Sequence, residues 1–294
     1  MVPDFVVAGH LTLDRNNGGD LLGGAAYSAL TAARLGRRVG LLTSYGPDLA
    51  PREDLAGIQV VAHASTRSTV FRNTYEYGRR RQRVLSAALP LDVADIPPAW
   101  REAPVVHLAP VLAELGAGFP DAFPKALMGA SPQGWMRRVD LQGRVCPAPW
   151  SWADQILSRL DLLVVSVEDL AGDEALIDQW AGKVRCLTLT AGAGGAWVYY
   201  KGQKRHIEAF PAQKLVDPTG AGDAFASAFL VKWSEVADPF EAAHFASLVA
   251  SFVVEEAGVA GVPTRSQVEA RRTTSRIIER TRLPRARQGE NSYL

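Results

Sequence analysis

Short continuous runs of apolar residues recur along the chain and predict buried strands of a mostly parallel sheet. The runs cover residues 5–8, 39–43, 105–109, 162–166 and 186–190. Continuous apolar runs indicate strands that are covered on both faces, as parallel strands are when helices lie on both sides of the sheet. The pattern therefore predicts an α/β fold.

Other segments show helical spacing or alternation. Helices are predicted over residues 21–36, 119–129, 150–160, 221–231 and 240–256, and from residue 264 onward. Residues 68–85 alternate between polar and apolar, which predicts a hairpin with a polar face. Residues 135–143 are predicted to form a further strand that ends on polar side chains. The chain therefore combines a large α/β core with one small, exposed sheet.

Composition narrows the possible function classes. At 294 residues the chain has room for one large α/β domain or two small ones. A net charge of +1 gives no global sign of nucleic-acid or membrane binding. No apolar run reaches the length of a membrane helix, and the first residues do not read as a signal peptide. Cys146 and Cys186 offer neither metal spacing nor a disulfide framework, so a reduced, cytoplasmic setting is expected.

A glycine loop that runs into a helix is the clearest candidate site. In LVDPTGAGDAF, residues 215–225, Gly220 and Gly222 permit tight backbone geometry just before helical spacing begins. The N–H groups at such a helix start, with the helix dipole behind them, suit an anion such as phosphate. Asp223 then has two interpretations. It takes a proton from a hydroxyl that attacks the phosphate, or it is an acidic residue that favours the dipole.

The segment DPTGAGDAF, residues 217–225, resembles the C-terminal signature of the PfkB (ribokinase-like) carbohydrate kinase family, and the resemblance extends over roughly residues 4–270. It implies a three-layer α/β/α sandwich with a mostly parallel sheet and a small β lid. It also implies ATP-dependent phosphorylation of a hydroxyl, with Asp223 as general base. The backbone of Gly220, Ala221 and Gly222 would then form the anion hole.

The resemblance also points to residues that bind the acceptor. The aspartate and the Gly-Gly pair that hold sugar hydroxyls in the family map to Asp14, Gly23 and Gly24. A carboxylate can accept two hydroxyl hydrogen bonds, and glycines let a polyol approach the backbone. Without the resemblance, a turn former at Asp14 and a helix start at Gly23 and Gly24 would be the preferred explanations. Tyr27 and Ser28 stand where ribokinase-type members carry Asn, which argues against ribose as the substrate.

The pattern Asp140-x-Gln142-Gly143 resembles the branch of the family that includes myo-inositol kinases. Because ligands gather at the carboxyl ends of strands in open α/β sheets, Asp140 and Gln142 are predicted to bind the acceptor. A sugar or cyclitol such as myo-inositol is therefore the first prediction. A nucleoside kinase, with Phe71 or Tyr75 stacking on the base, is the alternative, and a non-catalytic ligand sensor on the same fold is a further one.

The donor site and the metal sites are carried over from the family in the same way. The residues predicted to contact ATP are Thr190, Gly192, Gly195, Ser247 and Ala250. Mg²⁺ is expected near Glu168 and Asp169, largely through water, although both could equally be the acidic first turn of a helix. Asp217 and Thr219 resemble the family's monovalent-cation loop, and use of K⁺ is left open.

The resemblance predicts one kinase domain over residues 1–283, into which lid strands at about residues 11–22 and 66–88 are inserted. A basic, disordered tail is predicted over residues 284–294. The expected partners are a small polyol and ATP, without nucleic acid or membrane. A homodimer formed through the lid is left open.

Overall fold

A nine-stranded sheet forms the centre of the molecule, with the strand order β15-β14-β13-β12-β9-β8-β1-β4-β5. The computed structural model describes residues 2–16, 19–49, 53–76 and 79–282. The strands of the sheet are β1 (Phe5–Ala8), β4 (Val39–Tyr45), β5 (Gln59–Ala64), β8 (Val105–Leu108), β9 (Leu127–Ala130), β12 (Leu162–Ser166), β13 (Cys186–Thr190), β14 (Ala196–Tyr200) and β15 (Gln203–Ile207). Neighbours from β13 to β5 pair in parallel, and β14 and β15 add an antiparallel edge.

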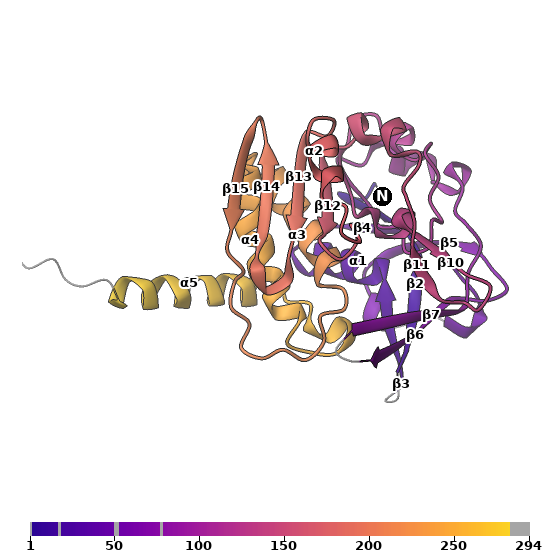
Figure 1. Ribbon diagram of the computed structural model, residues 1–294, viewed down its shortest axis with the longest axis horizontal. Helices are drawn as coiled ribbons and strands as arrows, with labels where there is room; N and C mark the ends of the chain where they lie inside the picture. The colour runs from indigo at the N-terminus through magenta and orange to yellow at the C-terminus, as the bar shows by residue number, and fades with distance from the viewer. Residues whose placement is uncertain (1, 17–18, 50–52, 77–78, 283–294) are drawn as a thin grey trace, which may run out of the picture.

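The two faces of this sheet bury separate hydrophobic clusters, which makes three layers. In β1, Phe5 and Val7 belong to one cluster, whereas Val6 and Ala8 belong to the other. The first face is covered by α1 (Ala25–Arg34), α3 (Ala221–Val236) and α4 (Pro239–Val253). The second face is covered by α2 (Ala175–Ala181) and several short 3-10 helices. The three-layer sandwich is confirmed, with one layer of long helices and one of short turns (Figure 1).

A second sheet of four strands, in the order β3-β2-β6-β7, lies off one end of the main sheet (Figure 1). Its strands are β2 (Leu11–Asn16), β3 (Gly19–Gly24), β6 (Thr69–Glu76) and β7 (Arg79–Ser86). The small β lid is thus present. Strand β3 includes residues 21–24, which the sequence pattern assigns to a helix, so that α1 begins only at Ala25.

One buried histidine connects three of the four places where the chain passes between core and lid. The His10 ring lies between β1 and β2, with Nδ1 at 2.9 Å from Thr69 Oγ1 and Nε2 at 2.9 Å from the Leu89 carbonyl. The N–H of Ala88 donates to the same Thr69 hydroxyl. Because a carbonyl can only accept, Nε2 carries the proton and Nδ1 accepts from Thr69.

Two of the predicted helices are wrong. Residues 119–129 contain the 3-10 helix Pro120–Ala122 and strand β9, because Pro124 removes an N–H and excludes the helical conformation for the residue before it. Residues 150–160 form the 3-10 helices Ala153–Gln155 and Leu157–Arg159. Their apolar side chains still belong to the second cluster. The apolar spacing therefore predicted correctly that these residues are buried, but they form 3-10 helices and not one α-helix.

The strand predicted over residues 135–143 is confirmed only for the three residues of β10 (Arg137–Val139), and it does not belong to the main sheet. The 3-10 helix Pro132–Met136 comes first, and β10 then pairs only with β11 (Val145–Pro147) in a separate two-stranded sheet. The main-sheet strand in this region is β9, where a side chain at Gly129 would come within 2.7 Å of Leu230 on α3. This close approach of helix to sheet explains why the strand has small residues and was missed.

The last helix, α5 (Arg265–Arg282), extends away from the rest of the molecule (Figure 1). Ion pairing between Arg271 and Glu255 (2.8 Å) attaches its first half to the end of α4. No helix in the described part of the chain is long and apolar enough to cross a membrane. The tail predicted over residues 284–294 lies outside the described residues.

Candidate active site

A cavity of about 1060 Å³ lies where the carboxyl ends of the parallel strands meet the lid and the start of α3. Ser166 ends β12, Thr190 ends β13 and Ser131 follows β9, and all three line the cavity. Asp14 and Phe71 contribute from lid strands β2 and β6. This is the edge of an open α/β sheet at which ligands bind.

The glycine loop enters this cavity through a turn that only glycine can make. Gly220 precedes α3 with φ 79° and ψ −4°, which is the left-handed region. A Cβ on Gly220 would overlap the ring of Tyr27, a buried side chain of α1. Of the three expected donors, Ala221 N–H donates to the Pro218 carbonyl (3.2 Å), whereas the N–H groups of Gly220 and Gly222 have no hydrogen-bond partner among the described residues. Two of the three expected backbone donors are therefore available to an anion.

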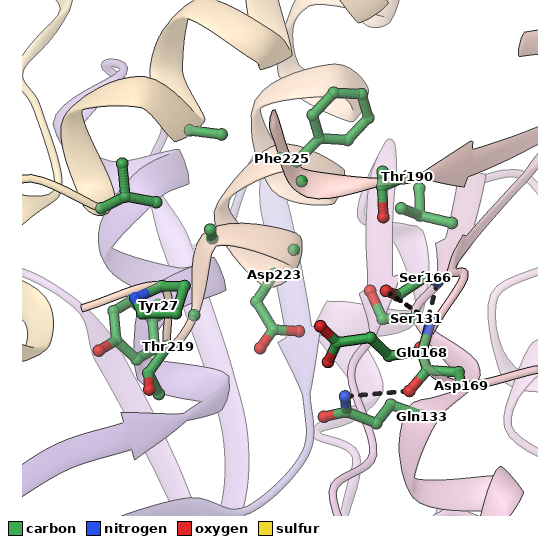
Figure 2. Close-up of a pocket in the computed structure, with 18 of the residues that line it drawn as sticks. Tyr27, Ser131, Gln133, Ser166, Glu168, Asp169, Thr190, Thr219, Asp223 and Phe225 are labelled. Atoms are coloured by element: carbon green, nitrogen blue, oxygen red, sulfur yellow. Dashed lines mark hydrogen bonds between the residues drawn. The ribbon is translucent and has the colours of Figure 1, made fainter. Parts of the chain in front are cut away.

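Asp223 lies in the first turn of α3, and its carboxylate points into the cavity between Thr219 and Glu168 (Figure 2). Burial raises the pKa of Asp223 to about 7, and the negative charges of Asp169 and Glu114 act in the same direction. The positive charge of Arg137 opposes this rise. A carboxyl group with a pKa near neutrality is suited to accept a proton at physiological pH.

The acceptor residues predicted in the lid come together. Asp14 and Gly24 line the cavity. A Cβ on Gly23 would lie 2.7 Å from Thr12 Oγ1 and 2.8 Å from Asp14 Oδ2, so the absence of a side chain there leaves room for both polar groups. Because the Asp14 carboxylate faces a cavity, it is placed to accept hydroxyl hydrogen bonds.

Asp140 and Gln142, by contrast, do not line the cavity. They lie in the turn between β10 and β11, where Asp140 accepts hydrogen bonds from Arg144 Nε (2.6 Å) and from the N–H of Gln142 (2.9 Å). The hydrogen bond from Arg144 holds the pKa of Asp140 below its usual range. The placement of these two residues in the site is thus corrected, because the strand before them belongs to an outer hairpin and not to the main sheet.

The structure brings an earlier and similar segment to that place. Ser131-Pro132-Gln133-Gly134 follows β9, and both Ser131 and Gln133 line the cavity. Gln133 Nε2 donates to Asp169 Oδ1 (3.1 Å), as Figure 2 shows. Arg137, a few residues later, also lines the cavity. The x-Gln-Gly pattern occurs at both places in the sequence, so a signal for these residues existed, although Ser131 stands where the later segment has Asp140.

All five residues predicted to bind the donor line the other half of the cavity: Thr190, Gly192, Gly195, Ser247 and Ala250. Ser247 Oγ accepts from the N–H of Phe210 (2.8 Å) and donates to the Glu208 carbonyl (3.1 Å), which fixes the loop opposite. Pro211 and Leu215 of that loop and Ala250 of α4 supply apolar surface. Such a combination of apolar walls and glycine-rich loops suits a nucleotide base and its phosphates.

The chemistry of the predicted metal residues fits a magnesium ion that keeps much of its water. Glu168 and Asp169 both line the cavity, and Asp169 Oδ2 accepts from the N–H of Ser166 (3.2 Å). Within the described residues, no three His, Cys, Asp or Glu side chains form a group that could hold a metal. Mg²⁺ at two carboxylates would need water and phosphate oxygens as its other ligands, which is its usual preference. Asp217 Oδ1 accepts from the N–H of Thr219 (2.9 Å), and K⁺ binding there stays a prediction.

Comparison with known proteins gives a family match that includes the glycine loop of the cavity. Residues 155–265, which contain the glycine loop and Asp223, match the sequence model of the pfkB family carbohydrate kinases. Over these residues the chain is similar to that family. The match indicates a phosphotransferase that acts on an alcohol group.

Two curated relatives are named as kinases of nucleosides. The cytidine kinase of Thermococcus kodakarensis is 27% identical over 79% of this chain and 88% of its own length. The nucleoside kinase of Methanocaldococcus jannaschii is 35% identical over 34% of each chain.

Among solved structures, a pyrophosphate-dependent kinase in the ribokinase family, complexed with a pyrophosphate analog and myo-inositol, is similar with a TM-score of 0.73 and 23% identity. The alignment covers 90% of this chain and 99% of that one. This likeness shows the ribokinase fold.

We predict that Gly220→Ala lowers the free energy of unfolding by at least ~1–2 kcal/mol, since alanine disfavours the left-handed conformation and its Cβ would overlap Tyr27. Gly222→Ala is the matched control, because a Cβ there meets nothing within 4 Å and the position lies inside α3. Its unfolding free energy should be unchanged or slightly higher. Urea denaturation measures both, and a Gly220→Ala protein as stable as the wild type would contradict the packing described.

We also predict that Asp223→Asn stabilises the protein, and more so near pH 8 than near pH 5. With a pKa of about 7 instead of the usual 3.8, folded Asp223 binds more protons than the unfolded chain between these values. The contribution of Asp223 to stability therefore falls as the pH rises through this range, and asparagine removes that loss. Thermal unfolding of both proteins at the two pH values tests this, and an equal difference at both would argue against the raised pKa.

Proposed function

We propose that this kinase transfers the γ-phosphate of ATP to a hydroxyl of a small polyol-like acceptor, with Asp223 as the general base. The observation that carries the proposal is the position of Asp223, whose pKa is about 7, beside the open N–H groups of Gly220 and Gly222 in one cavity. The base and the anion-binding backbone therefore belong to the same turn of α3.

In this proposal the chain's residues divide the work between the two halves of the cavity. Asp14 accepts hydrogen bonds from acceptor hydroxyls and orients the one that attacks. Asp223 takes the proton of that hydroxyl as the new O–P bond forms, and the N–H groups of Gly220 and Gly222 donate to the phosphoryl oxygens. The lid sheet, which carries Asp14 and Phe71, excludes water that would otherwise compete as acceptor. Bound Mg²⁺ would neutralise phosphate charge near Glu168 and Asp169.

ATP is favoured over pyrophosphate as the donor. Pyrophosphate needs only the polar groups around the glycine loop. The donor half extends further, along the apolar wall formed by Pro211, Leu215 and Ala250. That surface has a use only if the donor carries a base.

As the acceptor, we favour a nucleoside over myo-inositol. The cyclitol prediction rested on Asp140 and Gln142, which lie in an outer turn, and the similar segment in the cavity offers the Ser131 hydroxyl in place of a carboxylate. Phe71 is a buried aromatic residue that lines the acceptor half and could stack on a base. The relatives named for cytidine and nucleosides support the same choice.

We predict that cytidine or adenosine gives the highest kcat/KM in a panel that also contains myo-inositol, ribose and fructose, each with ATP or pyrophosphate and Mg²⁺. Release of ADP or phosphate is the readout. A clear preference for myo-inositol would overturn the choice of acceptor, and turnover with pyrophosphate alone would overturn the choice of donor. Nucleotide binding without turnover on any acceptor would favour the sensor alternative.

We predict that Asp223→Asn lowers kcat by roughly 10²–10⁴-fold, the usual contribution of a general base, while the affinity for ATP changes little. Asp238→Asn is the matched control. It makes the same chemical change at the N-cap of α4, where asparagine caps a helix equally well. Steady-state kinetics and calorimetric titration with ATP measure the two quantities. Near-normal turnover in Asp223→Asn would exclude the assigned role.

A further inference from the structure

The cavity contains one cationic side chain among the described residues that line it, and this is Arg137. Four carboxylates line the same cavity: Asp14, Glu168, Asp169 and Asp223. A reaction that moves a phosphoryl group through a site so rich in negative charge needs positive charge close to the transferred group. Arg137 and Asp223 line the same cavity, which places Arg137 on the wall of the site where the proposed base lies, and its positive charge opposes the rise in the pKa of Asp223.

The backbone that carries Arg137 is held rigidly on the core side. Gly134 N–H donates to the Pro110 carbonyl (3.0 Å), and Trp135 Nε1 donates to the Leu115 carbonyl (2.8 Å). The Trp135 ring is buried and stacks on Trp150 at 4.7 Å between ring centroids. A side chain attached to such a rigid backbone is preorganised, and electrostatic stabilisation of a transition state requires preorganised groups.

The other side of the same segment is attached to the lid. Arg137 pairs with Pro147 in the β10–β11 hairpin. At the tip of this hairpin, the Gly143 carbonyl accepts from the N–H of Val84 on lid strand β7 (2.8 Å), and the Gln142 carbonyl accepts from Arg83 (2.6 Å). The hairpin thus connects the core to the lid. The turn that holds Asp140 serves this attachment.

We propose that Arg137 is a further catalytic residue of the kinase reaction, whose guanidinium donates hydrogen bonds to the phosphoryl group during transfer. This inference rests on the proposed function. The bond from phosphorus to the donor oxygen breaks, the bond to the acceptor oxygen forms and the acceptor's proton goes to Asp223, while Arg137 keeps its own protons. A planar guanidinium presents a fork of donors that matches phosphate oxygens better than an ammonium does.

Arg137 would affect the reaction differently if it acted only through Asp223. In that case its loss would raise the pKa of the base further, and turnover would recover fully at high pH, where Asp223 is ionised. A residue that contacts the phosphoryl group is needed at every pH. The pH dependence of kcat therefore separates the two roles.

The experiment compares Arg137→Met and Arg137→Gln with wild type, with ATP and the best acceptor of the panel, across pH 6–9. We expect kcat to fall roughly 100-fold or more at every pH, and the acidic limb of the profile to move to higher pH. Arg137→Lys should recover part of the loss. Arg138→Met is the matched control, because Arg138 is the exposed neighbour on the same strand and does not line the cavity, and its kcat should stay within about twofold.

Two results would overturn the inference while the proposed function stands: an undiminished kcat in the Arg137 variants, or a kcat that returns to the wild-type value at high pH. Unfolding midpoints and ATP titrations confirm that each variant is folded and binds the donor. If one of the two neutral variants does not fold, the other decides. Failure of the proposed function is a separate result, because wild type itself would then be inactive across the whole panel.

Discussion

The contact between Gly220 and the Tyr27 ring is the constraint on which the site depends. It joins the start of α3 to α1, which lie far apart in the sequence, at a distance that leaves no space for a side chain. Ser227 Oγ donates a further hydrogen bond to the Ser28 carbonyl (2.8 Å), about two turns further along α3. Because α1 begins directly after Gly24, this packing sets the distance between the acceptor half of the cavity and the glycine loop. Figure 2 shows Tyr27 beside Thr219 for this reason.

Charge gives the site its second constraint. Four carboxylates line one cavity. Burial is the main cause of the raised pKa of Asp223, and the negative charges of Asp169 and Glu114 add to it. Such a group destabilises the fold and is kept where function needs it. Gln133, which donates to Asp169, and Arg137 bring the compensating donors from one segment. The proposed base, its charge partners and the backbone proposed to bind the anion therefore form one electrostatic unit.

Site predictions that rested on a short sequence motif were more successful than those that also needed a correct strand assignment. Two of the signals lie within a few consecutive residues: the glycine loop with Asp223, and the run from Thr190 to Gly195. Both segments line the cavity as expected. Asp140 and Gln142 depended on the strand before them belonging to the main sheet. This assumption was wrong, because within the described residues β10 pairs only with β11. The residues that do line the cavity follow β9, a strand that contains a glycine.

By itself, the sequence determined the α/β class, the lid hairpin, the glycine loop and the residue that we propose as the base, because continuous apolar runs, alternation and glycine spacing act over a few residues. Only the tertiary structure decided which of the two x-Gln-Gly segments enters the site, and that Arg137 lines the same cavity as Asp223. Which sheet a strand joins is decided by contacts between segments that are distant in the sequence, such as the contact of Gly129 with Leu230. Those contacts leave no periodic pattern in the local sequence, so no local reading could choose between the two segments.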